Sequence, residues 1–274
     1  MIHLDEIKAI SDPMERYTFA NAAFNVERDL ASVRVRELLE AHGLSQHFVC
    51  TSIGVDPGGF HRHLKKSFTM QPHALTHLCY SFLNMSAHET LLGIRAEVPL
   101  PRDLSFLVSI MMEPAKIPYA EKLHTELQEV YSHAKANQEL FTAKSTESEC
   151  HDLIRSRIIE YARDHFIVPH SICGERMHMS LRLAIKALME ENTNALAAIN
   201  TLLYIAVETN MPLDYFISPI YANLCDLRLH ESQPGDIIKD KKILLFVVKF
   251  LQLRPALQKE FLTHAMQEYW NYPD

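Results

Sequence analysis

A cluster of cationic side chains follows Asp56 and Pro57 in the sequence. Arg62, Lys65 and Lys66 are spaced three and four residues apart, so a helix would place them on one face. Guanidinium and ammonium groups donate to phosphate oxygens, and a guanidinium can also bond the edge of a guanine base. This spacing therefore predicts a cationic helix face that suits an anionic groove.

Two short helices and a tight turn are expected to position this face. The first helix is predicted to begin at Ser45 and to carry Phe48, Val49 and Ile53 inward. Gly54 follows, because a sharp corner between helices needs the positive φ that glycine adopts at no steric cost.

The second helix is predicted to begin with Asp56 as N-cap and Pro57 at its first position. Phe60 and Leu64 are four residues apart, so they share a face and pack against the first helix. Gly58 shares the opposite face with the cationic residues, which keeps that face narrow.

This stretch, LSQHFVCTSIGVDPGGFHRHLKKSF, resembles the helix–turn–helix of DNA-binding repressors. RVRELLEAHGLSQ precedes it and HALTHLCYSFLNMSAHETLLG follows, and with these flanks residues 33–93 resemble the five-helix lambda-repressor-like (Xre-type) domain. The string GVDPGGFHRHLKKSFTMQP is also similar to the DNA-recognition helix (reading helix) of AraC-type proteins. Those proteins carry two such motifs, and a second is not found here at the family's spacing. The closing LNMSAHETLLG favours the Xre type.

The resemblance implies double-stranded DNA as the partner. In the Xre-type family, the start of the second helix bonds a phosphate, and the third helix presents its early residues to base edges. Two positions that normally carry base-reading side chains are glycines here, so readout must depend on nearby side chains or on DNA shape. Gln71 and His73, in the following loop, are second-rank backbone contacts. The residues expected to bind DNA are Ser45, Gln46, Gly58, Gly59, His61, Arg62, Lys65 and Lys66.

The composition indicates a folded, all-α protein. The chain has 274 residues, of which 47% are hydrophobic, enough for one large core or two ordinary ones. Only seven glycines are present, and four of them lie between Gly43 and Gly59. Little turn chemistry is left for strands elsewhere.

Charge is shared unevenly along the chain. The formal net charge of −7 argues against a protein that coats nucleic acid without specificity. Residues 31–95 nevertheless hold six Lys or Arg against four Asp or Glu, together with seven of the 16 histidines. We therefore expect any nucleic-acid contact in this segment.

The sequence predicts a cytoplasmic location and free thiols. No apolar run approaches the roughly 18 residues of a membrane helix, and no signal-peptide pattern begins the chain. The five cysteines are an odd count without C-x-x-C spacing, which favours buried, unpaired thiols.

We expect three regions: a helical arm (1–30), the helix–turn–helix domain (31–97) and an all-helical regulatory or dimerisation domain (98–274). In the arm, Phe19, Ala23, Val26 and Leu30 have helical spacing and are expected to pack on the helix–turn–helix domain. The boundary is placed where two prolines interrupt helix formation at residues 98–101.

A long helix is expected over residues 119–144. Its apolar stripe is either ordinary core or a contact in a symmetric dimer, and the sequence leaves both open. The stripe comprises Leu123, Leu127, Val130, Ala134 and Phe141.

Residues 154–218 resemble a second, degenerate copy of the first domain. IRSRIIEYARDH aligns with VRVRELLEAHG, and INTLLYIAVETNMPLDYFI aligns with LTHLCYSFLNMSAHETLL. The position of the reading helix falls on SLRLAIKALM, which is too apolar to face phosphates. Generic helical core with accidental similarity is an equal alternative.

No set of residues predicts catalysis. Two E-x-x-H spacings, Glu121–His124 and Glu175–His178, resemble half of a di-iron motif, but chance accounts for them. His73 and His77 are four apart without a carboxylate pair or cysteine beside them. We expect no enzymatic activity, no cofactor and no metal, because nucleophile, base and oxyanion groups are not found together.

The leading hypothesis is a sequence-specific DNA-binding transcriptional regulator that acts as a homodimer. Its C-terminal helical domain would provide dimerisation and would sense an effector, if one exists. The alternative is a protein-interaction module on the same helix–turn–helix scaffold, without DNA binding. An iron or zinc enzyme is a third hypothesis, tested by metal analysis.

Overall fold

The computed structural model describes residues 4–66, 68–164, 199–233 and 235–271, and it is all-α apart from two short strands. Contacts between backbone positions divide the chain into two units. The first unit comprises residues 1–96 and 143–218, and the second comprises residues 97–142 and 219–274. Among the described residues, no helix combines the length and apolar character that crossing a bilayer requires.

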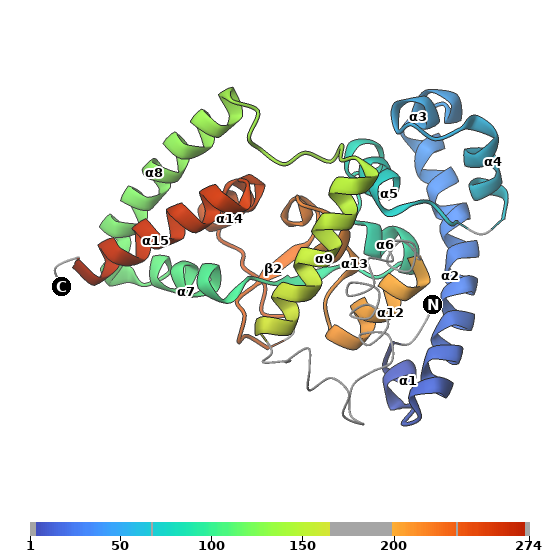
Figure 1. Ribbon diagram of the computed structural model, residues 1–274, viewed down its shortest axis with the longest axis horizontal. Helices are drawn as coiled ribbons and strands as arrows, with labels where there is room; N and C mark the ends of the chain where they lie inside the picture. Colours follow the sequence, from blue (N-terminus) through green and yellow to red (C-terminus); the bar gives the residue numbers. More distant parts are fainter. Residues whose placement is uncertain (1–3, 67, 165–198, 234, 272–274) are drawn as a thin grey trace. The chain divides into compact units, whose positions relative to one another are not determined.

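The first unit is built along one long helix, α2 (Pro13–Ala41), which follows the short helix α1 (Leu4–Ala9) (Figure 1). One face of α2 is buried, and it includes Phe24, Ala31 and Val35. Because α2 continues without interruption past residue 30, the expected arm and the first helix of the expected domain are a single element.

The apolar stripe expected to bury the arm lies on the outer face of α2 instead. Phe19 is 44% exposed, Val26 60% and Leu30 43%. The prediction was wrong because α2 carries two stripes, and packing selected the one that contains Ala20 and Phe24.

Four shorter helices and a π-helical segment follow α2 in the first unit. Positive φ angles end two of these helices: Asn84 ends the π-helical segment, and Gly93 ends α6. Arg34 on α2 also bonds the end of α6, where its guanidinium donates to the Leu91 carbonyl at 2.6 Å. The elements are α3 (Gln46–Ser52), α4 (Pro57–Lys65), α5 (Pro72–Leu78), the π-helical segment (Cys79–Leu83) and α6 (Ala87–Leu92).

Among the described residues from later in the chain, three helices belong to the first unit: α9 (Glu147–Asp164), α12 (Ile199–Thr209) and α13 (Leu213–Ile217). Helix α12 contacts α2, whereas α13 contacts α5, α6 and α9. This grouping differs from the expected domain of residues 98–274, because the apolar faces of these helices are buried in the first unit. The segment expected to hold a degenerate reading helix, residues 180–189, lies outside the described residues.

Buried Asp214 joins α13 to α6. Its carboxylate accepts from the backbone N–H groups of Ala87 and His88, each at 2.8 Å, and from the Tyr80 hydroxyl at 3.0 Å. In return, His88 Nδ1 accepts from the Leu213 backbone N–H at 3.2 Å. Each helix start is therefore bonded by a side chain of the other.

The second unit has a helical core beside a two-stranded parallel sheet. Strand β1 (Glu97–Pro99) pairs with β2 (Asp226–Arg228), with Val98 opposite Leu227. The remaining elements are α7 (Arg102–Met111), a 3₁₀ turn (Pro114–Lys116), α8 (Ile117–Ala136), a 3₁₀ turn (Tyr221–Asn223), α14 (Lys241–Gln252) and α15 (Pro255–Asn271).

Helix α8 contributes part of its apolar stripe to the core of the second unit. Leu123, Leu127 and Ala134 are buried, which assigns them to core, whereas Val130 and Phe141 are half-buried. The helix ends earlier than expected, because Gln138 adopts φ 58° and Phe141 then donates its backbone N–H to the end of α14 at Gln252. The expectation of buried, unpaired thiols is confirmed for Cys50, Cys79 and Cys150, and Cys225 is also buried.

Candidate nucleic-acid interface

Helices α3 and α4 form the helix–turn–helix unit, which we define as residues 45–66. The Ser45 hydroxyl accepts from the Phe48 N–H at 3.2 Å, and the Asp56 carboxylate accepts from the Gly59 N–H at 2.7 Å. Gly54 has φ 74° between the two helices. The helix starts and the corner therefore agree with the sequence prediction, because each depends on a local side chain or on glycine.

Two apolar side chains hold α4 against the rest of the first unit. Phe60 and Leu64 are buried at 1% and 2% exposure, and α4 contacts both α2 and α3. Two hydrogen bonds join α2 to the segment that follows α4. Arg28 Nε donates to the Phe68 carbonyl at 3.0 Å, and the Phe68 N–H donates to the Arg28 carbonyl at 3.2 Å. Helix α4 therefore has a defined orientation on α2.

The opposite face of α4 is open to solvent. Gly58, His61, Arg62, Lys65 and Lys66 are exposed, and Gly59 is half-buried. The structure thus places Gly58, Gly59, His61, Arg62 and Lys65 on one short helix and Lys66 directly after its end, with Ser45 and Gln46 exposed at the start of α3.

The electrostatic character of this face is cationic. Between Gln46 and Gln71 the only acidic residue is Asp56, and its carboxylate is engaged at the start of α4. An acidic cap at a helix start also complements the positive end of the helix dipole. Arg62, Lys65 and Lys66 therefore carry the net charge of the surface.

The two histidines of α4 have different surroundings. His61 is exposed, whereas half-buried His63 has its Nδ1 at 3.0 Å from the Thr69 hydroxyl. Burial, followed by the nearby charges of Arg62 and Arg28, lowers the pKa of His63. His63 is therefore neutral at neutral pH and adds no charge to the cationic face. Of the second-rank residues, Gln71 is exposed and His73 is half-buried.

Phe48 does not point inward as expected. It is 56% exposed and packs edge-to-face on Phe82, with ring centroids 6.0 Å apart, while Val49 and Ile53 are buried. Val49 and Ile53 are four residues apart and share the buried face of α3, whereas Phe48 is offset from Val49 by about 100° around the helix. Phe48 is therefore an exposed aromatic side chain that contacts half-buried Phe82.

Sequence reasoning also missed Arg28, which positions α4 through Phe68. Arg28 is 8% exposed and also donates to Asn200 of α12 at 2.7 Å. A single arginine in an acidic helical segment carries no local signal for this role. Only its long-range partners reveal it.

Fold and site together describe an all-α protein with a helix–turn–helix unit whose second helix exposes a cationic face. No protein-family model, curated protein or solved structure matches the chain.

Proposed function

We propose that this protein is a sequence-specific, DNA-binding transcriptional regulator that acts in the cytoplasm as a homodimer. The observation that supports it is the division of α4 into two faces. Phe60 and Leu64 are buried on one face, while Arg62 and Lys65 on the other face, and Lys66 directly after the helix, are exposed. A short helix whose buried face fixes its orientation has the dimensions of a recognition helix that binds in the major groove.

Each cationic residue has a separate role in this proposal. Lys65 and Lys66 neutralise phosphates, which gives affinity that falls as salt concentration rises. The guanidinium of Arg62 can donate two hydrogen bonds, one to O6 and one to N7 of a guanine base. Gly58 and Gly59 allow the backbone of α4 to approach the duplex closely, so DNA shape contributes to selection.

Homodimerisation follows from the need for specificity. A single helix of nine residues contacts few base pairs, and two-fold pairing on a palindromic site doubles the number of contacts. The two reading helices would then lie about 34 Å apart, one helical turn of the duplex.

The test is a fluorescence-anisotropy titration of the full chain against fragments of its own genome, at two salt concentrations. We expect a subset of fragments to bind at least tenfold more tightly than the rest, with affinity for all falling at higher salt. Equal, weak binding to every fragment would contradict the proposal.

The alternative function is a protein-interaction module, and the contact between exposed Phe48 and half-buried Phe82 favours it. An aromatic pair is typical of protein contacts, whereas phosphate contacts use polar groups. Phe48→Ala separates the two functions. Under the DNA-binding proposal it leaves DNA affinity within about threefold, whereas a protein partner bound at this pair loses affinity by tenfold or more.

A further inference from the structure

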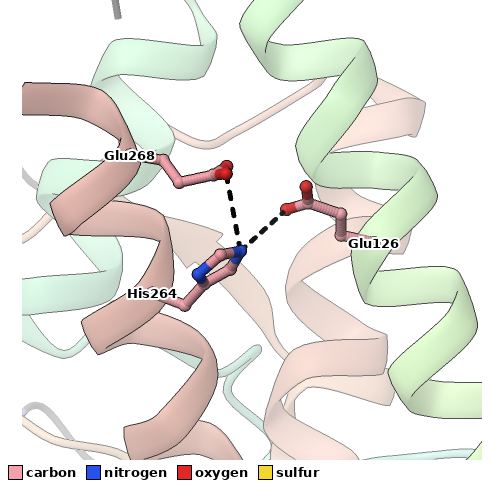
Figure 2. Close-up of side chains that lie close together, drawn as sticks. All are labelled: Glu126, His264 and Glu268. Atoms are coloured by element: carbon pink, nitrogen blue, oxygen red, sulfur yellow. Dashed lines mark ion pairs between the residues drawn. The ribbon is translucent and has the colours of Figure 1, made fainter. Parts of the chain in front are cut away.

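Three metal-ligating side chains converge in the second unit. His264 and Glu268 are one turn apart on α15, and Glu126 comes from α8 (Figure 2). Figure 2 shows the imidazole of His264 directed between the two carboxylates. The helices are held in register by Tyr119 of α8, whose hydroxyl donates to the Ala265 carbonyl on α15.

The separations suit a small cation. His264 Nε2 lies 3.6 Å from Glu268 Oε1 and 3.9 Å from Glu126 Oε2, and one ligand atom from each residue lies within 4.8 Å of the others. Ligands about 2.1 Å from a tetrahedral zinc ion are roughly 3.4 Å apart. Small side-chain rotations are therefore enough to bring the three donors to coordinating distance.

Two carboxylate oxygens at this site lack a hydrogen bond. Oε2 of Glu126 and Oε2 of Glu268 are shielded from solvent, and neither accepts a hydrogen bond from the described residues. A shielded carboxylate oxygen without a donor is costly, and a bound cation is one of the few groups that can satisfy it.

Lys122 adds a positive charge beside the two carboxylates of the cluster. Its ammonium lies 2.7 Å from Glu268 Oε1 and 3.5 Å from Glu126 Oε1. Hydrogen bonding to Glu268 and the two negative charges raise the pKa of Lys122. Lys122 is therefore bound to the same carboxylates that a metal would use, and it opposes a second cation by charge repulsion.

We propose that Glu126, His264 and Glu268 form a site for a first-row divalent metal ion of the zinc class. One imidazole nitrogen with two carboxylate oxygens suits such an ion better than calcium or magnesium, which prefer oxygen ligands alone. His264 is 55% exposed, so water completes the coordination. Lys122 weakens the site and sets its affinity.

The test is isothermal titration of the full-length, metal-stripped protein with Zn²⁺ at pH 7.5, together with the absorption spectrum of the Co²⁺ form. We expect one equivalent to bind through this site. His264→Ala and Glu126→Gln should each weaken that binding at least tenfold, and Lys122→Met should tighten it.

His133→Ala is the matched control, because His133 is an exposed histidine on the same helix, α8, and should leave binding unchanged. Chemical unfolding of each variant shows that the fold persists, and Glu268→Gln provides a second probe should one variant unfold. Absence of stoichiometric binding would overturn the proposal. So would binding unchanged by His264→Ala, or a preference for Ca²⁺ over Zn²⁺.

Discussion

At the scale of single residues, Arg62→Ala and Lys66→Ala are expected to change DNA binding in different ways. Arg62→Ala should reduce discrimination between preferred and mismatched DNA by about 1–3 kcal/mol, because a bidentate contact to one base is lost. Lys66→Ala should weaken binding to all sequences alike and reduce the slope of log affinity against log salt by about 1.

Binding measured on matched and mismatched duplexes at several salt concentrations separates these effects. Lys242→Ala, an exposed lysine of α14 in the second unit, is the control and should change neither quantity. Equal losses on every sequence for both α4 variants would contradict the assigned roles.

His88 should make the folded protein sensitive to mild acid. Burial lowers the pKa of His88 to about 4, below the usual value of 6.5. Between these pH values the unfolded chain binds a proton that the folded chain does not, so stability is complete above pH 6.5 and falls as pH falls toward 4. The expected loss is about 3 kcal/mol over that range.

Urea unfolding of wild type and His88→Asn across this pH range measures the effect. Asparagine retains an acceptor for the Leu213 N–H but does not titrate, so its pH profile should be flatter. Burial raises the pKa of neighbouring Asp214, which has the opposite pH dependence, and comparing the two proteins isolates His88. Parallel profiles would exclude His88 as the cause.

At the scale of elements, the two glycines of α4 are expected to lower the stability of the fold while allowing the backbone of α4 to approach DNA closely. A helical glycine costs about 0.5–1 kcal/mol relative to alanine. A Cβ at Gly59 would meet Asp56 Oδ2 at 3.5 Å, an ordinary contact, whereas at Gly58 the same oxygen lies at 3.2 Å. Gly59→Ala should therefore stabilise the fold by about 0.5–1 kcal/mol, and Gly58→Ala by less.

The same substitution should lower DNA affinity, because the added methyl group holds the backbone of α4 away from the duplex. Thermal unfolding and DNA titration of one Gly59→Ala preparation test both effects. A variant that is more stable and binds DNA as tightly as wild type would show that close approach at this position is unnecessary.

At the scale of the whole molecule, we expect the helix–turn–helix domain predicted from the sequence to depend for its stability on helices from later in the chain. Asp214 bonds the start of α6, and the Thr76 hydroxyl donates to the Ile217 carbonyl at 3.2 Å. A fragment of residues 1–97 lacks these partners and exposes the surfaces that α9, α12 and α13 cover. Circular dichroism with urea should show that it unfolds well below the full chain.

Asp214→Ala in the full chain tests the same contact with a single change. It leaves buried N–H groups of α6 without an acceptor, so a loss of roughly 3–5 kcal/mol is expected. Asp152→Ala, an exposed acidic residue of α9, is the control and should have little effect. A stable fragment and a neutral Asp214→Ala would together contradict this dependence.

The amino-acid sequence by itself determined the helical class and the local frame of the helix–turn–helix unit. Ser45, Asp56 and Gly54 act within a few residues of their own positions, so their roles are readable without a partner. The buried pair Phe60 and Leu64 follows from helical spacing for the same reason.

Only the tertiary structure decided which stripe of α2 faces the core, why Phe48 is exposed, and which unit residues 143–218 join. It also brought Glu126 to His264 and Glu268 from a distant part of the chain. Periodicity shows that a helix has an apolar or polar face, but the surface that this face meets is supplied by other elements. Contacts between residues far apart in sequence therefore leave little signal in the sequence around either one.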